Sequence, residues 1–355
     1  MENLKQLQKI KRRNRLTLVS LCILVVVLAV ACMFAGSSGM SIADGLKALM
    51  GKGSPAQNRI IWNIRIPRVL AAIVAGAGLS VAGLIMQSTL NNAMASPSTL
   101  GVSNGAVFGA NLSIIVFSGG FLATGNNALR FDVGANPYAT SALAFFFAMA
   151  SVLLILGLCS IRAFSPNVVV LAGIAIGAVW TAATTVLQFY ATDVGLSAAV
   201  VWSFGDLSRA TYLKIAIMAA VTAVGIAYFA LMSWQFNALL SGEATAKTMG
   251  VRTSSLRFVA LLLGSMITAV CVSFLGVIGF VGIICPHITK RLLGQDHRIT
   301  IPVSCLLGSV LLLFADTCSR TIGSGTALPV GAITSLLGAP FFLAIIFSRK
   351  ERGQC

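Results

Sequence analysis

Apolar runs long enough to cross a membrane recur from one end of this 355-residue chain to the other. A helix of about 20 apolar residues spans roughly 30 Å of hydrocarbon. Only 10% of the residues are charged, whereas a soluble domain carries about a quarter. Regular alternation of polar and apolar residues, which would indicate a membrane β-barrel, is absent. The sequence therefore predicts an all-α polytopic membrane protein.

Ten membrane spans fit the apolar runs, and the run from Leu256 to Ile288 is the one ambiguous case. At about 1.5 Å per residue it would extend roughly 50 Å, too long for one crossing. Its glycines from Gly276 to Gly282 offer a place to turn, so we expect two crossings there, the second of them short. The other eight spans are expected at 16–35, 65–92, 101–116, 139–161, 168–190, 212–234, 301–318 and 328–347.

The distribution of basic residues sets the orientation, because cytoplasmic loops of membrane proteins carry an excess of Lys and Arg. With ten spans, most of the 25 basic residues fall on the side that holds both termini. Counting Leu256–Ile288 as one span reverses that majority. Ten spans with both termini in the cytoplasm are therefore preferred. The net charge of +16 then reports orientation, and nucleic acid is not an expected partner.

The first apolar run follows a basic segment, and the two together resemble a signal peptide. The run is long, and no A-x-A-type cleavage site closes it, so we interpret it as a retained first span. The predicted organisation is a basic cytoplasmic segment (1–15), a single transmembrane domain (16–348) and a cytoplasmic tail (349–355).

Several stretches between the spans have predicted structures of their own. We expect a short surface helix at 41–50, a polar turn at 91–98, an external loop at 118–138 and a short re-entrant or surface helix within 191–211. Pro67 suits the first turn of its span, where the missing N–H costs nothing. The small-residue faces at Gly76–Gly83 and Gly101–Gly109 predict close approach between helices.

One polar segment, residues 237–257, lies between two long apolar runs and so cannot itself lie in hydrocarbon. Ser241 predicts a helix N-cap, which places Glu243 in the first turn and pairs it with Lys247 at i,i+4. Gly250 can end that helix. A short helix between two spans is typical of a docking surface for a soluble partner, and an ordinary interfacial loop is the alternative.

Three arginines lie on the outer side, against the orientation rule, and each is within about a turn of a span: Arg65, Arg68 and Arg320. One interpretation is that their long side chains extend to the lipid headgroups. The other is an external basic patch that receives carboxylates of a partner protein. Asp316, one turn before Arg320, is a candidate local partner.

Four polar side chains lie within spans or near their ends: Gln87, Asn91, Asn104 and Gln188. They are candidates for the lining of a translocation path. The alternative, which we favour, is hydrogen bonding between helices.

Catalytic motifs are missing from the chain. No G-x-x-x-x-G-K-[ST] occurs, so ATP hydrolysis by that route is excluded, and H-E-x-x-H and G-x-S-x-G are also absent. The eight cysteines include no CxxC pair, and only two histidines are present, so no metal site is expected. The acidic residues fall at segment ends, which weakens an ion-coupled carrier without excluding it. An intramembrane enzyme would need a buried catalytic pair that the sequence does not offer.

Five segments, in order, resemble the FecCD/BtuC-type permease family, the membrane subunits of type II ABC importers for iron–siderophores, haem and cobalamin. The resemblance covers about residues 16–348. In one departure, Asn92–Ala95 lacks the first proline of a run that many members carry at that turn. The five segments are RIPRVLAAIVAGAGLSVAGLIMQ, ASPSTLGVSNGAVFGA, LSGEATAKTMGV, GVIGFVGIICPHITKRLLGQDHR and LPVGAITSLLGAPFFLAII.

This resemblance implies a BtuC-like fold, with a second permease subunit, two cytoplasmic ATPases and an external substrate-binding protein as partners. ATP and Mg would be bound by the ATPases, so no cofactor is expected on this chain. The three external arginines match positions that receive acidic residues of the binding protein. The ATPase-coupling element matches residues 241–251, from which we select Ser241, Gly242, Glu243, Ala244, Lys247, Met249, Gly250 and Val251.

Siderophores are the commoner cargo in that family, so the resemblance implies an iron–siderophore importer, with cobalamin or haem as the alternative. The expected location is the cytoplasmic membrane of a bacterium. The expected mechanism is that ATP closes the ATPase dimer, which pulls on the 241–251 helices and rocks the spans between inward-open and outward-open states.

Overall fold

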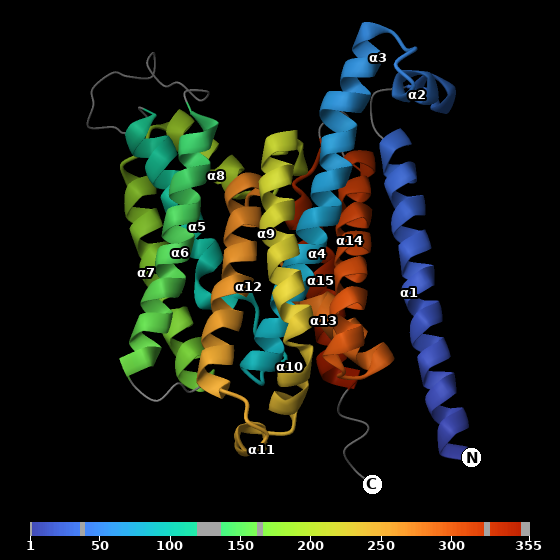
Figure 1. Cartoon of the computed structure of the whole chain (residues 1–355). Helices are drawn as coiled ribbons and strands as arrows, with labels where there is room; N and C mark the ends of the chain where they lie inside the picture. Colours follow the sequence, from blue (N-terminus) through green and yellow to red (C-terminus); the bar gives the residue numbers. More distant parts are fainter. Residues whose placement is uncertain (1, 36–39, 119–135, 162–165, 323–326, 349–355) are drawn as a thin grey trace.

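The computed structural model describes residues 2–35, 40–118, 136–161, 166–322 and 327–348, which form a bundle of helices (Figure 1). Most of the predicted loop 118–138 and the whole tail 349–355 lie outside the described residues. The two ends of the described chain lie at the same end of the bundle, as the orientation argument requires for termini on one side of a membrane.

The prediction of about ten crossing helices is confirmed. Within the described residues, seven helices are long and apolar enough to span a membrane. Shorter crossings complete the set. In chain order the crossing helices are α1 (Glu2–Phe34), α4 (Ile66–Thr89), α5 (Val102–Asn111) with its π-helical continuation η3 (Leu112–Phe117), α6 (Pro137–Ile161), α7 (Pro166–Phe189), α9 (Tyr212–Leu231), α12 (Thr253–Leu275), α13 (Val281–Leu293), α14 (His297–Ile322) and α15 (Val330–Ser348).

Short helices join or extend these crossings. They are α2 (Ile42–Leu49), α3 (Pro55–Arg59), η1 (Ile60–Arg65), η2 (Pro97–Leu100), α8 (Asp193–Ser203), η6 (Leu207–Arg209), α10 (Ser233–Leu240) and α11 (Glu243–Thr248). The surface helix predicted at 41–50 is α2, which Ser41 caps by accepting a hydrogen bond from the Asp44 N–H. The short helix predicted within 191–211 is α8.

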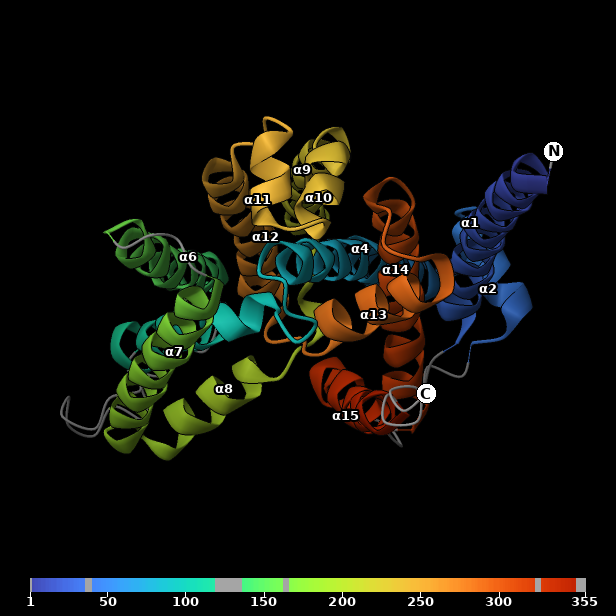
Figure 2. The ribbon, with the colours of Figure 1, turned by 90° about the horizontal axis from the view of Figure 1, so that it is seen from below.

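Helix α4 is the centre of the larger part of the bundle, where it packs against α9, α12, α13 and α14 (Figure 2). Its glycines allow this packing. A Cβ at Gly76 would lie 2.3 Å from the Gly308 carbonyl oxygen, and one at Gly83 would lie 1.9 Å from the Gly282 oxygen. The predicted small-residue face is therefore a contact face, on which backbone meets backbone.

Helices α5, α6 and α7 form a second group with its own apolar core, beside α12 (Figure 2). Its aromatic centre is Phe108, which lies 4.9 Å from Phe147 and 5.1 Å from Trp180 between ring centroids. A Cβ at Gly109 would lie 2.3 Å from the Leu143 oxygen, so the face from Gly101 to Gly109 is also a contact face.

Pro67 lies in the first turn of α4, as expected. Helical structure nevertheless begins earlier, at Pro55, where Ser54 and Gln57 form a capping box, and it continues through η1 into α4 without a break. A proline inside a helix leaves the carbonyl four residues earlier without its donor. Residues Ile60–Arg65 adopt π-helical bonding just before Pro67, and such bulges accommodate a disturbed hydrogen-bond ladder.

The prediction of two crossings within 256–288 is confirmed. Helix α12 ends at Leu275, Gly276 has a φ of 81°, and α13 starts at Val281 after Phe280 with a φ of 64°. The extended link runs beside Phe204, with which Val277 forms a parallel bridge. Helix α13 has 13 residues, so the second crossing is short, as expected.

Candidate functional site

The candidate coupling site is the turn of chain from α10 through α11 to the start of α12, at the end of the bundle that holds both described chain ends (Figure 1). Glu243 is its central side chain. Its Oε1 lies 2.8 Å from the Lys247 ammonium, the predicted i,i+4 pair, and its Oε2 accepts a 2.6 Å hydrogen bond from Arg257 Nη1. Arg257 is 5% exposed, so this ion pair fastens α11 to the buried first turns of α12.

One carboxylate with two cationic donors is strongly held in its charged form. The hydrogen bonds from Lys247 and then from Arg257 lower the pKa of Glu243 below its usual value of 4.5. Ala246 and Val251 are buried, with 0% and 5% of their surface exposed, and they anchor the underside of the segment. The outer face presents Ser241, Gly242, Ala244, Lys247, Met249 and Gly250, all exposed.

The predicted N-cap is wrong by one residue. Ser241 is the C-cap of α10, and Gly242 precedes α11 with a φ of 105°, a conformation that favours glycine. The chain turns sharply between α10 and α11, and the positive φ of that turn requires a glycine at the N-cap, where we expected a serine. The predicted end is confirmed, since Gly250 follows the C-cap Met249 with a φ of 83°.

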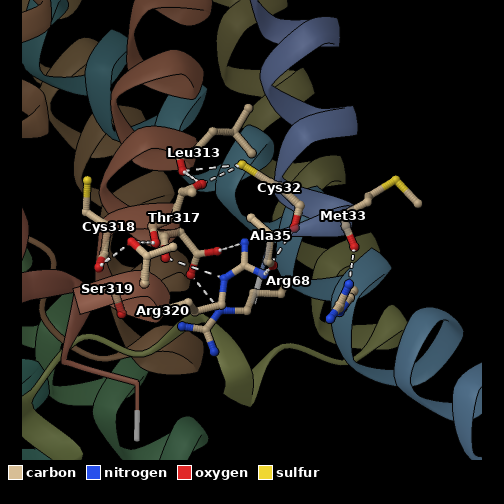
Figure 3. A network of polar contacts seen from close by, with 12 residues as sticks. Cys32, Met33, Ala35, Arg68, Leu313, Thr317, Cys318, Ser319 and Arg320 are labelled. Atoms are coloured by element: carbon tan, nitrogen blue, oxygen red, sulfur yellow. Dashed lines mark hydrogen bonds and ion pairs between the residues drawn. The ribbon is translucent and has the colours of Figure 1, made fainter. Parts of the chain in front are cut away.

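The three arginines predicted on the outer side contact Asp316 or the end of α1. Figure 3 labels two of them, Arg68 and Arg320. Asp316 is fully buried on α14. Arg68 Nε lies 2.5 Å from its Oδ1, and Arg320 Nη2 lies 2.9 Å from its Oδ2. The candidate local partner of Arg320 is therefore shared with Arg68, which reaches it from α4.

The arginines also hold the carbonyl end of α1. Arg65 Nη1 donates to the Met33 and Phe34 oxygens at 2.7 and 3.3 Å. Arg320 Nη1 donates to the Cys32 and Ala35 oxygens at 3.1 and 2.9 Å (Figure 3). The last carbonyls of a helix have no partner within the helix and carry partial negative charge. Two arginines from other helices supply these bonds, which ties α1 to α14 and to η1, the segment that continues into α4.

This burial differs from an exposed basic patch. Arg65 and Arg68 are each 5% exposed, so neither side chain extends to the headgroups. Sequence reasoning missed this for Arg65 and Arg68 because their acceptors, the end of α1 and Asp316, lie far from them in the chain. The role of these arginines in docking a partner stays a prediction.

Three of the four polar candidates bond between helices, which is the alternative that we favoured: Gln87, Asn104 and Gln188. Gln87 donates to the Gly282 and Ile283 oxygens and accepts from Lys290 Nζ at 3.2 Å. Gln188 Nε2 donates to Asn111 Oδ1 at 3.0 Å. Asn91 is exposed in the turn after α4, with a φ of 45°.

Asn104 differs from the others because it also lines a cavity. Its Nδ2 donates to the Gly177 oxygen at 3.1 Å and to Thr181 Oγ1 at 3.2 Å. The cavity holds about 590 Å³ between α5, the η2 turn and α7. Its polar lining is uncharged: Ser98, Thr99, Asn104, Thr181 and Thr185. Membership of a translocation path stays a prediction for all four residues.

A network near the inner end of α4 has no counterpart in the predictions. His297 Nδ1 lies 2.8 Å from Asn237 Oδ1, and its Nε2 lies 2.8 Å from Ser88 Oγ. Asn237 Nδ2 donates to Asp296 Oδ1 at 2.7 Å. These bonds connect α10, which leads into α11, to α4 and α14. Pairing across so many residues leaves no local sequence signal.

The fold and this site define a multi-span membrane subunit with a short structured element between its sixth and seventh crossings. The model of the FecCD transport family matches residues 23–348. A relative described as an ABC transporter permease of Methanocaldococcus jannaschii is 44% identical, over 97% of this chain and 99% of its own length. The hemin transport system permease of Yersinia pestis is 34% identical, over 95% of this chain and 97% of its own length.

Solved structures agree with the sequence relatives. A chain described as an inward-facing metal-chelate type ABC transporter superposes with a TM-score of 0.79 at 25% identity, over 94% of this chain and 99% of that one. The protein belongs to the FecCD transport family. It is a permease subunit of an ABC importer, and the chemical step of ATP hydrolysis is not its own.

Proposed function

We propose that this permease carries an iron–siderophore complex across the cytoplasmic membrane, driven by ATP hydrolysis on two partner ATPases. An external binding protein delivers the cargo, and a second permease subunit completes the path. ATP and Mg belong to the ATPases, and the iron is part of the cargo. Because an archaeal relative is 44% identical, the expected bacterial membrane widens to that of a bacterium or an archaeon.

The ion pair between Glu243 and Arg257 carries this proposal. A docking surface on α11 can drive transport only if a force on α11 reaches the membrane spans. The ion pair joins α11 to α12, with 2.6 Å between Glu243 Oε2 and Arg257 Nη1. From α12 the contacts continue to α4, α6 and α9. A conformational change needs contacts that differ between the two states. An ATPase dimer that closes with ATP would supply that difference at α11.

The uncharged cavity beside Asn104 supports a bulky chelate as cargo. Hydroxyl and amide groups on α5 and α7 can contact a large polar ligand weakly, without a fixed charge that would retain it. Polar side chains within spans usually face a bundle interior or a water-filled space. The hemin permease and the metal-chelate type transporter among the similar proteins favour the same class of cargo.

On the outer side, docking would be an exchange of carboxylates. Asp316 already occupies Arg68 and Arg320, so an acidic residue of the binding protein would compete with it. Arg68 Nη2 makes no hydrogen bond and has Asp206 Oδ1 at 3.8 Å, which leaves a donor for an arriving carboxylate. Binding energy from docking could in this way loosen the tie between α1, α4 and α14.

Copurification with the neighbouring ATPase tests the coupling part. Wild type should retain the ATPase, and a Glu243→Arg, Gly250→Trp double variant should lose it while the permease stays folded in detergent. A wild-type chain that retains no ATPase contradicts the proposal.

Uptake by the reconstituted complex tests the cargo. Ferric siderophore should be imported in preference to hemin and cobalamin, with ATP required in each case. Hemin is the second candidate, because the Yersinia pestis permease at 34% identity transports it according to its name. Preference for hemin would replace the siderophore assignment and leave the importer mechanism intact.

A further inference from the structure

A second cavity, at the outer end of the bundle, is separate from the coupling element, the arginine cluster and the cavity beside Asn104. It holds about 420 Å³ between η3, α6, α8, η6, α9 and α12. Two cations line it, Arg209 and Lys214, and no Asp or Glu is among its described lining residues. Lys214 is 8% exposed, so its ammonium is withdrawn from bulk water.

The charge of Lys214 has no counterion in the described part of the chain. Its Nζ donates to the Arg209 carbonyl oxygen at 3.1 Å and lies 5.8 Å from the centre of the Tyr138 ring. Neither contact carries a full negative charge. Asp206 precedes η6 and is the carboxylate closest to Lys214 in the chain. It accepts hydrogen bonds from the Ser208 N–H and hydroxyl and lies 3.8 Å from Arg68 Nη2. A buried ammonium left in this way is unfavourable unless an anion joins it.

Helix ends add to the positive potential. Lys214 is in the first turn of α9, where the partial charge of the helix is positive and a cation is unfavourable. The cavity is also lined by Asn136, Pro137 and Thr140, at the start of α6. Both helix starts lie at the outer end of the bundle (Figure 1). Helix N-termini of this kind attract anions.

Arg209 has a different role from Lys214. Its two Nη atoms donate to the Trp202 and Val201 oxygens, each at 2.8 Å, and so satisfy the last carbonyls of α8. Arg209 therefore shapes one wall of the cavity and adds positive charge there. Lys214 is the side chain with donors left for a ligand.

We propose that this cavity binds a phosphate group, in the first place that of a membrane lipid in the outer leaflet. The position of the cavity along the membrane normal favours a lipid. Tyr138 and Tyr212 are half-exposed at the starts of the two flanking spans, and tyrosines are enriched at the membrane–water interface. Besides the cations and several uncharged polar residues, the lining includes the apolar side chains of Ile114, Trp202 and Phe274, which suit the glycerol and upper acyl region. On the cytoplasmic side of membrane proteins, basic pockets between helices bind lipid headgroups, and this cavity would use the same chemistry at the outer end of the bundle. A free phosphate ion has the same chemistry and is the second source.

Native mass spectrometry of the detergent-purified permease tests the lipid. With phosphatidylglycerol titrated in, Lys214→Gln should weaken binding about tenfold, as expected for loss of a charge-assisted contact, and Lys214→Arg should restore most of it. Lys52→Gln, which removes an exposed external cation, is the matched control and should bind as wild type does. Ala198→Phe should also weaken binding, because it fills the cavity without altering its charge.

Inorganic phosphate distinguishes the two sources. A thermal shift produced by phosphate over chloride at equal ionic strength, present in wild type and absent in Lys214→Gln, would support the site with a soluble ligand. The proposal is overturned if Lys214→Gln and Ala198→Phe bind the lipid as wild type does and phosphate produces no shift. If Lys214→Gln fails to fold, the test still decides. Lys214→Arg and Ala198→Phe both keep the positive charge, and lipid binding by these two variants can be compared with that of wild type.

Discussion

Arg68 and Asp316 lie 248 residues apart in the sequence and form a buried ion pair with 2.5 Å between Nε and Oδ1. Asp316 also pairs with Arg320, and Arg320 with Arg65 holds the carbonyl end of α1. One carboxylate therefore pairs with two cations at the junction of three helices. Its removal leaves Arg320 without a carboxylate among its described ion pairs, and it leaves Arg68 with Asp206 alone, at 3.8 Å.

We predict that Asp316→Asn lowers the free energy of unfolding by about 3–5 kcal/mol, the usual consequence of removing one partner from a buried ion pair. The thermal unfolding midpoint in detergent measures this. Asp193→Asn, at an exposed carboxylate in the first turn of α8, should have an effect of about 1 kcal/mol or less. Equal midpoints for the two variants would show that the Asp316 pairs contribute no net stability.

The backbone contact between α4 and α14 predicts a strong effect of one added methyl group. Gly76→Ala puts a Cβ 2.3 Å from the Gly308 oxygen, so the helices must separate, at a cost of about 1–3 kcal/mol. Gly157→Ala is the matched control on α6, since its Cβ would meet nothing within 4 Å, and it should be neutral or stabilising. Thermal midpoints that fall equally in both would refute the close-packing explanation.

The attachment of α11 should depend on pH. The pKa of Glu243 is lower in the folded protein than the usual 4.5, so its ion pairs stabilise α11 above pH 4.5. That stabilisation is lost as the pH falls through the lowered pKa. Amide hydrogen exchange in 243–248 should accelerate over this range, after correction for intrinsic rates. Glu243→Gln should exchange rapidly at every pH, and a wild-type profile as flat as that of the variant would contradict the prediction.

The network around His297 should connect the coupling segment to α4. Ser88→Ala removes the partner of His297 Nε2 and leaves a buried ring nitrogen unsatisfied, a loss of about 1–3 kcal/mol. Ser254→Ala is the control, at an exposed hydroxyl at the start of α12. Thermal unfolding of the two variants measures the difference, and no difference would mean that His297 finds another partner.

Much of the fold follows from local patterns. Apolar length and the orientation of basic residues predicted the crossings, including the division of 256–288, because hydrocarbon thickness limits every span. Ser41 precedes α2 and Gly250 follows α11, as expected, because capping depends on the neighbouring backbone alone. The glycine faces of α4 and α5 were also readable, because only a missing side chain allows such contact.

The errors occur where a residue's role depends on distant partners. Arg65 is buried because the end of α1 lacks donors, which is not visible at its position in the sequence. The importance of Arg257 depends on Glu243, which lies across the turn between two helices.

The most direct test of the coupling is a charge exchange between Glu243 and Arg257, assayed as ATP-dependent uptake of ferric siderophore in proteoliposomes. Glu243→Arg and Arg257→Glu should each reduce uptake at least tenfold, and the double exchange should recover a substantial part of it, because the ion pair is restored with reversed polarity. Single variants that transport at the wild-type rate, with the ATPase bound, would contradict transmission through this pair.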